Sequence, residues 1–242
     1  RALKSGERRG AIVAALATVL VPALALGVAS VINTRPGDGA GAEMARAESG
    51  LSDQPVVVGA KSFTEQYILA EVIESRLRAA GAQTERRDNL GSTVVFDALR
   101  SGEIDVYVDY TGTLWANAMG EDAPIGRHVM NSAVTSWLYD NAGIVSLGRL
   151  GFENAYGFAV TRTFADANEL ETISDLARLS SLSVGADPEF FARPEWERTR
   201  SLYGLEGVEQ RSMDSTFMYD AVQNGAVDVI TAYTSDGRVL AY

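Results

Sequence analysis

Two aspartates and two tyrosines occupy matched positions in two segments of the chain. Residues 92–111 (STVVFDALRSGEIDVYVDYT) and 215–234 (STFMYDAVQNGAVDVITAYT) share nine of 20 residues at a constant offset of 123. A pair of carboxylates suits acid–base chemistry, but Asp105 and Asp228 stand where a strand begins, which favours a structural role. Tyr110 and Tyr233 follow strand ends, where open α/β sheets bind ligands. The tyrosines are therefore either ligand contacts or ordinary strand-end aromatics.

The elements that position these residues predict an α/β fold. The first segment reads as strand, helix, strand, helix and strand, expected at 56–58, 62–81, 84–87, 92–100 and 104–108. This alternation favours a parallel sheet. The repeat predicts a second α/β lobe of similar topology. Two such lobes facing each other would hold a ligand between them and close by a hinge.

The composition excludes several kinds of chemistry. The 242 residues contain no Cys and one His, and the net charge is −11. No disulfide, thiol nucleophile or Cys-based zinc site is available, and one His cannot build a multi-His metal centre. The strong acidity argues against nucleic acid as a partner. Since the sequence also shows no phosphate loop and no nucleophile elbow, we predict a protein that is not an enzyme and has no cofactor; His128 is expected to be solvated.

The N-terminal part differs in character from the rest. Residues 1–50 carry a net charge of +2 and the remainder −13. Within 1–33, a basic start precedes Ala11–Ile32, 22 residues without a charge, and a helix of that length can cross a bilayer core of roughly 30 Å. It is either a retained transmembrane helix or a cleaved signal. Either reading places the body outside the cytoplasmic membrane, after a flexible linker at 34–55.

Five segments together resemble one family. They are GAKSFTEQYIL (59–69), SGEIDVYVDYTGT (101–113), ENAYGFAV (153–160), PEFFARPE (188–195) and NGAVDVITAYTSDGR (224–238). In order and spacing they are similar to glycine betaine/choline/carnitine-type substrate-binding proteins of osmoprotectant ABC importers. The resemblance spans about residues 56–242.

The resemblance implies a two-lobed, periplasmic-binding-protein-like (type II) α/β clamp. Lobe 1 would comprise 56–153 and 234–242, and lobe 2 would comprise 154–233. In the family a further tyrosine follows some two dozen residues after the last one matched here, so the C-terminus is expected to be truncated.

The resemblance also implies a cage for a quaternary ammonium group. Its walls would be Tyr110, Tyr156 and Tyr233. A trimethylammonium group donates no strong hydrogen bond, and each aromatic face attracts it by roughly 0.5–2 kcal/mol. Gln66 matches a polar contact, and Asn154 stands where some members have an aspartate near the cation.

Three further residues match contacts to a ligand carboxylate in the family: Lys61, Thr113 and Arg193. Charge-assisted bonds from the two cations would orient that carboxylate. With Thr113, they favour a betaine that carries a carboxylate. The alternatives are a solvated loop lysine at Lys61 and a surface ion pair of Arg193 with Glu189 or Glu195.

The implied function is capture of a small quaternary ammonium compound, such as glycine betaine, carnitine or choline, for an ABC importer. The implied partners are an ABC permease, separate or fused, its ATPase, and the membrane through the N-terminal segment. Two alternatives stay open: an ergothioneine-binding domain of a permease-fused importer, and the ligand-sensing domain of a membrane receptor.

Overall fold

The computed structural model describes residues 55–240, which form two compact α/β units. The first unit contains residues 55–62, 66–119 and 125–149, and the second contains 63–65, 120–124 and 150–240. Within residues 55–240 no helix has the length and apolar character needed to span a membrane. The expected membrane or signal segment, Ala11–Ile32, lies outside the described residues.

The first unit is built on a short parallel pair of strands. Its elements are β1 (Val56–Lys61), α3 (Thr64–Ala79), β2 (Thr84–Leu90), α4 (Ser92–Ser101), α5 (Thr111–Thr113), the π-helical turn η1 (Leu114–Ala118), α6 (Arg127–Trp137) and the π-helical turn η2 (Leu138–Ala142). β1 pairs with β2 in parallel, as the sequence predicts.

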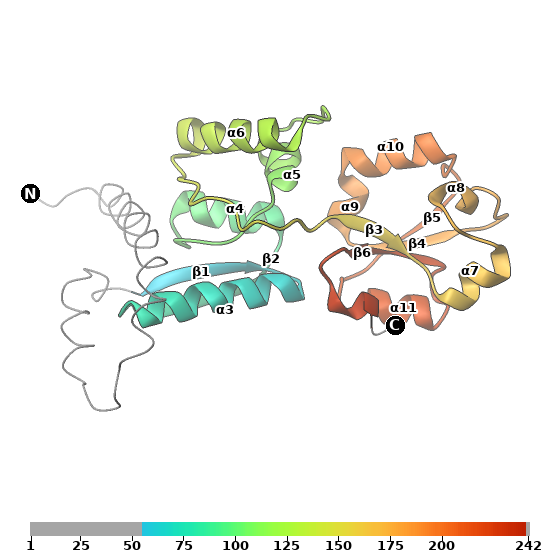
Figure 1. Ribbon diagram of the computed structural model, residues 1–242, viewed down its shortest axis with the longest axis horizontal. Coiled ribbons are helices and arrows are strands. Elements are labelled where there is room, and N and C mark those ends of the chain that lie inside the picture. Colours follow the sequence, from blue (N-terminus) through green and yellow to red (C-terminus); the bar gives the residue numbers. More distant parts are fainter. Residues whose placement is uncertain (1–54, 241–242) are drawn as a thin grey trace, which may run out of the picture. The chain divides into compact units, whose positions relative to one another are not determined.

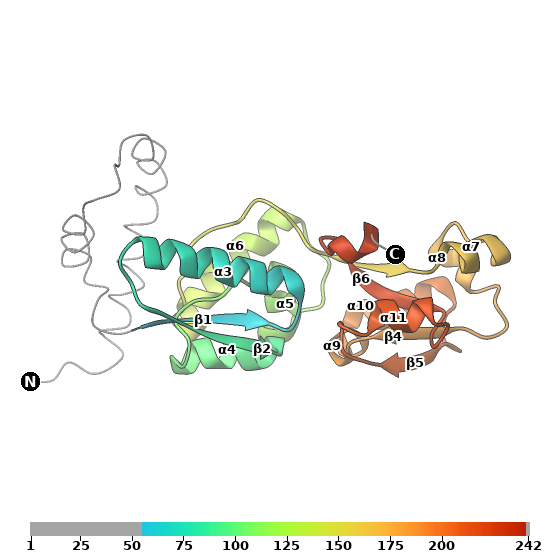
Figure 2. The same ribbon diagram turned by 90° about the horizontal axis from the view of Figure 1, so that it is seen from below.

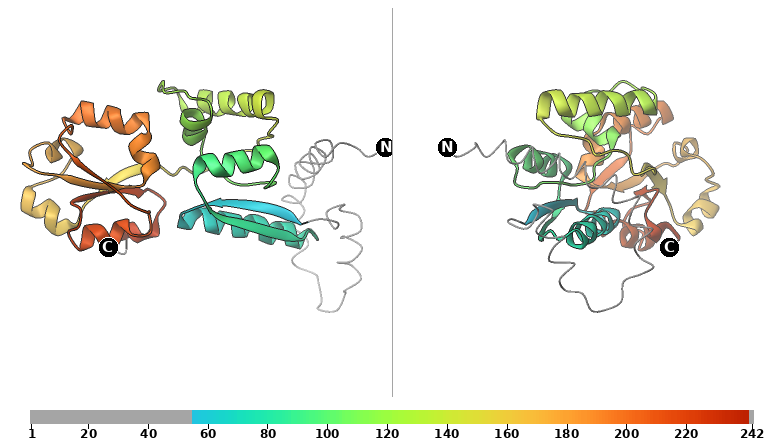
Figure 3. Two further views of the ribbon diagram at one scale, coloured as in Figure 1. Left: turned by 180° about the vertical axis from the view of Figure 1, so that it is seen from behind. Right: turned by 60° about the vertical axis from the view of Figure 1, so that its left-hand side comes forward.

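Helices cover both faces of this pair. α3 and α4 lie on opposite sides of β1 and β2 (Figure 1, Figure 3). Alternate residues of β1, namely Val56, Val58 and Ala60, are buried against Ala70 and Leu77 of α3. A strand with both faces covered has to be apolar throughout, which explains its Val-Val-Val start.

The second unit contains a four-stranded sheet. Its elements are β3 (Tyr156–Ala159), α7 (Arg162–Asn168), α8 (Ile173–Leu176), β4 (Ser183–Ala186), α9 (Pro188–Ala192), α10 (Pro194–Tyr203), β5 (Glu209–Ser212), α11 (Met218–Gln223), β6 (Val229–Tyr233) and the 3-10 turn η3 (Gly237–Leu240). The strand order is β3-β6-β4-β5; β4 is parallel to β5 and β6, and β3 is antiparallel to β6.

The core of this sheet is aromatic on one face. α10 and α11 lie on opposite faces (Figure 1, Figure 2). Trp196 and Phe190 pack with Val184 and Val229 in one buried cluster. Around α11, Met218, Tyr219 and Val222 form a second cluster with Ile230 and Ala232 of β6.

The repeat found in the sequence is confirmed in the topology. Val58 of β1 bridges to Val106, and the matched Val184 of β4 pairs with Val229 of β6, both in parallel. The glycine after each central valine is also matched in its surroundings. A Cβ at Gly59 would meet Ile104 at 2.5 Å, and one at the matched glycine of β4 would meet Val227 at 3.2 Å.

The structural role predicted for the repeated aspartates is confirmed. Asp105 accepts a hydrogen bond from the amide of Val57 at 2.8 Å. Asp228 accepts one from the amide of Ser183 at 2.8 Å and one from its hydroxyl at 2.7 Å. Each carboxylate thus accepts a hydrogen bond from a backbone amide near the start of the neighbouring strand. A buried amide needs such an acceptor.

Replacing Asp228 with Ala should lower the free energy of unfolding by about 1–3 kcal/mol, because the amide and hydroxyl of Ser183 lose their acceptor. Urea denaturation followed by circular dichroism measures the change. Glu206→Ala, which removes an exposed carboxylate from the same unit, is the control and should change little. Equal midpoints for the two variants would contradict the role of Asp228.

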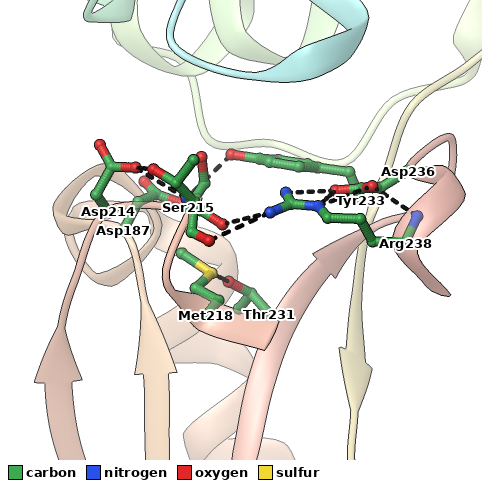
Figure 4. A network of polar contacts seen from close by, with 9 residues as sticks. Asp187, Asp214, Ser215, Met218, Thr231, Tyr233, Asp236 and Arg238 are labelled. Atoms are coloured by element: carbon green, nitrogen blue, oxygen red, sulfur yellow. Dashed lines mark hydrogen bonds and ion pairs between the residues drawn. The ribbon is translucent and has the colours of Figure 1, made fainter. Parts of the chain in front are cut away.

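Two features differ from the expectations. The strand expected at 104–108 is reduced to the single bridge at Val106, and Tyr110, with an extended backbone, precedes α5. The segment after β6, expected in the first lobe, packs with the second unit as far as Leu240. Arg238 contacts the second unit in two ways. Its guanidinium carbon lies 4.4 Å from the ring centroid of Tyr219. It also donates a hydrogen bond to the carbonyl of Ser215 at 3.3 Å (Figure 4).

Candidate ligand-binding site

A buried ion pair lies at the end of β1 in the first unit. The Lys61 ammonium contacts the Asp109 carboxylate, and both side chains are buried. The Tyr107 hydroxyl donates to the other carboxylate oxygen of Asp109. Burial first, and then the charge of Asp109, raises the pKa of Tyr107. Lys61 is therefore not the solvated loop lysine that one sequence interpretation allowed.

Gln66 joins this ion pair to a predicted cage residue. Its side-chain oxygen accepts from the Lys61 amide at 3.3 Å, and its Nε2 donates to the Tyr110 hydroxyl at 3.0 Å. The Lys61 ammonium lies 5.3 Å from the centre of the Tyr110 ring. Thr113 ends α5, the short helix that Tyr110 caps. The structure thus brings Lys61, Gln66 and Tyr110 together, with Thr113 one helical turn further on.

Two predicted cage residues meet in the second unit. Tyr156 opens β3 and Tyr233 closes β6, and the antiparallel register makes them direct partners. Their ring centroids are 5.2 Å apart and the rings are tilted by 43°. Phe190 lies 4.8 Å from Tyr156 on the other side. The two rings therefore form adjoining walls rather than a parallel stack.

A carboxylate that the sequence analysis did not select lies beside these two phenols. Asp187 follows β4 and caps α9 by accepting from the Phe190 amide at 3.0 Å. Both phenol groups point at its Oδ2, from Tyr156 at 3.4 Å and from Tyr233 at 3.5 Å, the latter drawn in Figure 4. Burial, aided by the charge of Glu189, outweighs the amide bond from Phe190 and raises the pKa of Asp187.

Arg193 lies beside the same tyrosines but is paired within its own segment. The residue is 8% exposed, and its guanidinium contacts Glu195 at 2.9 Å and Glu189 at 3.6 Å. Its central carbon is 5.8 Å from the Tyr156 ring centre. Burial acts to lower the pKa of Arg193, but the hydrogen bond to Glu195 and the charges of Glu195 and Glu189 together outweigh it and raise the pKa. The alternative pairing considered from the sequence is present, with a buried guanidinium and carboxylates that are partly exposed.

Asn154 lies two residues before Tyr156, in the segment that enters β3. His128 is the second residue of α6 and is exposed, as predicted. Among residues 55–240, no group of three or more His, Cys, Asp or Glu side chains is arranged to hold a metal ion.

The phenols near carboxylates have raised pKa values. Burial, then the charges of Asp187 and Glu189, raises the pKa of Tyr156. Burial, then Tyr156 and Asp187, raises the pKa of Tyr233. Burial, then Asp236, raises the pKa of Tyr219 to about 12.

Because these pKa values are raised in the folded state, the protonated phenols stabilise the fold. Their contribution is complete below the ordinary phenol pKa of about 10 and is lost as the pH rises through the raised values. In an alkaline titration followed at 295 nm, we expect fewer than the nine tyrosines to ionise before circular dichroism shows unfolding. Ionisation of all nine in the folded protein would contradict this; the same titration in urea is the control.

The residues missed from the sequence had two available signals. Asp109 directly precedes Tyr110 in the repeat segment. Asp187 follows Val184-Gly185-Ala186 just as Lys61 follows Val58-Gly59-Ala60, so the two stand at matched positions with opposite charge. Neither signal reveals which charges pair, because the partners are far apart in the chain.

Both units place polar and aromatic side chains where central parallel strands end. Lys61 ends β1, Asp187 follows β4 and Tyr233 ends β6. This is the edge at which open α/β sheets bind ligands. The fold and these side chains define a ligand-binding protein of the α/β class.

Comparison with known proteins identifies the family. The chain belongs to the substrate-binding domains of ABC-type glycine betaine transport systems, which match residues 54–242. It is 30% identical to a crystal structure of a glycine betaine/carnitine/choline ABC transporter, with a TM-score of 0.56, covering 77% of this chain and 71% of that one.

Two curated relatives have named ligands. The ergothioneine transport permease/ergothioneine-binding protein of Helicobacter pylori is 27% identical over 78% of this chain. The glycine-betaine-binding protein of Pseudomonas aeruginosa is 31% identical over 75% of this chain. This chain spans 34% of the first relative and 62% of the second.

Proposed function

We propose that this chain captures a small quaternary ammonium compound, such as glycine betaine, carnitine or choline, on the outer side of the cell membrane and passes it to an ABC permease. It acts as a binding component and not as an enzyme. The family match and the ligands of its relatives support this proposal.

The tyrosine pair of the second unit is the observation that carries the proposal. Tyr156 and Tyr233 form adjoining aromatic walls, 5.2 Å between centroids, with a carboxylate at their hydroxyl ends. Aromatic faces attract a weakly hydrated ammonium through their quadrupoles. A carboxylate nearby adds a full negative charge.

The first unit contributes a second set of polar groups. Tyr110 is oriented by Gln66, and Lys61 lies close to its ring. We propose that both units contribute to ligand affinity, in a clamp that closes on the ligand. The partners would be a permease, fused or separate, with its ATPase, and the membrane.

Isothermal titration calorimetry on the purified chain with glycine betaine, carnitine and choline tests the proposal. We expect saturable binding of at least one of them. We expect no binding of analogues without a quaternary ammonium group, such as glycine. Absence of heat with every quaternary ammonium compound would overturn it.

Ergothioneine, a histidine betaine, is the second candidate, because a relative that binds it matches 78% of this chain. It belongs in the same titration series. Tighter binding of ergothioneine than of the three osmoprotectants would favour this alternative. Attachment to a signalling domain of a membrane receptor, instead of to a permease, is the other alternative.

A further inference from the structure

The two matched residues at the ends of the central strands carry opposite charges and have different partners. In the first unit, Lys61 is neutralised by Asp109, which directly precedes Tyr110. In the second unit, Asp187 stands at the position of Lys61, but the residue before Tyr233 is Ala232. The repeat therefore keeps the tyrosine and removes the partner charge.

Asp187 consequently lacks a cationic partner in its own unit. Among residues 55–240, no Lys or Arg forms an ion pair with it; its polar contacts are two phenol hydroxyls and backbone amides at the start of α9. The nearby Arg193 is bound to Glu195 and Glu189 instead. Arg193 thus lies near three carboxylates, those of Asp187, Glu189 and Glu195, and pairs with the last two. A partly buried carboxylate is costly unless a positive charge compensates it.

We propose that Asp187 is the counter-charge for the ammonium group of the ligand and is the residue that makes the Tyr156–Tyr233 site select cations. The two phenols hold the carboxylate at the edge of their rings, so that an ammonium against the ring faces is attracted by both rings and carboxylate. This inference rests on the proposed function, and it adds a charge-selecting residue to it.

Burial raises the pKa of Asp187, as expected for a carboxylate that no cation compensates. A bound ammonium would favour the ionised form. The geometry alone carries the proposal, and this shift agrees with it.

Asp187→Asn is the test variant. Asn keeps the shape and is a preferred helix cap, and its side-chain oxygen can still accept from the phenols, so only the charge is lost. Affinity is measured by calorimetry with whichever of glycine betaine, carnitine or choline the wild type binds most tightly, and thermal stability by circular dichroism. Glu206→Gln removes an exposed carboxylate from the same unit and is the matched control.

We expect Asp187→Asn to weaken binding at least about tenfold, with an unfolding temperature equal to or above that of the wild type, and Glu206→Gln to change affinity less than about twofold. Asp187→Ser, which also caps a helix, should give the same pattern. Unchanged affinity in Asp187→Asn would overturn the inference, and so would a loss of affinity accompanied by an equal loss of stability in both variants. Failure of the wild type to bind any of the three compounds would instead overturn the proposed function on which the inference rests.

Discussion

Asp109→Ala is expected to lower the free energy of unfolding of the first unit by about 3–5 kcal/mol. The side chains of Lys61 and Asp109 are 4% and 7% exposed, so the substitution leaves the Lys61 ammonium buried without its partner. The Tyr107 hydroxyl loses its acceptor as well. Urea denaturation followed by circular dichroism measures this loss.

A matched control separates burial from charge pairing in general. Arg87 and Glu85 form an ion pair whose side chains are 57% and 45% exposed. Glu85→Ala should therefore cost less than about 1 kcal/mol. The double variant Lys61→Met with Asp109→Leu should recover part of the stability, because it removes both buried charges. If Asp109→Ala and Glu85→Ala shift the urea midpoint equally, the buried pair is not what stabilises the end of β1.

Tyr233→Ala is expected to weaken binding of the quaternary ammonium ligand by about 30-fold or more, which corresponds to about 2 kcal/mol. The change removes one aromatic wall and the partner that sets the tilt of Tyr156. It also removes one of the two phenols that contact Asp187. Calorimetry with the ligand that the wild type binds most tightly measures the effect.

Tyr233→Phe distinguishes the ring from the hydroxyl. It keeps the aromatic face and loses only the contact to Asp187, so it should bind more tightly than Tyr233→Ala. Tyr139→Ala is the control, because Tyr139 is 69% exposed in the first unit, and its affinity should match that of the wild type. A folded Tyr233→Ala protein with wild-type affinity would remove Tyr233 from the binding site.

The two cations predicted to contact a ligand carboxylate have carboxylate partners within the protein, and their contact with a ligand stays a prediction. Lys61 and Arg193 were both expected to reach a ligand carboxylate. In the structure Lys61 contacts Asp109, and Arg193 contacts Glu189 and Glu195. Lys61 and Arg193 thus have carboxylate partners, whereas no Lys or Arg among residues 55–240 forms an ion pair with Asp187.

Local patterns determined much of the fold. The apolar run of β1, the alternation of strand and helix patterns, and the repeat at an offset of 123 residues predict strands, helices and two α/β units without reference to distant contacts. These features depend on residues close in the chain, where steric preference and periodicity act directly. The same patterns selected Tyr110 and Tyr233, since a residue after a predicted strand lies at the binding edge of the sheet.

Only the tertiary structure decided which groups touch. Lys61 and Asp109 are 48 residues apart, and Asp187 lies 31 residues from Tyr156 and 46 from Tyr233. Such contacts depend on strand register and order: β6 between β3 and β4 brings the two tyrosines next to the end of β4. A sequence shows charges and aromatic rings one at a time, but whether a buried charge is compensated depends on what the folded sheet places beside it. The sequence therefore determined the class of fold and selected the candidate cage tyrosines. The register of the sheet decided that Asp187 stands beside Tyr156 and Tyr233, with no Lys or Arg among residues 55–240 paired to it.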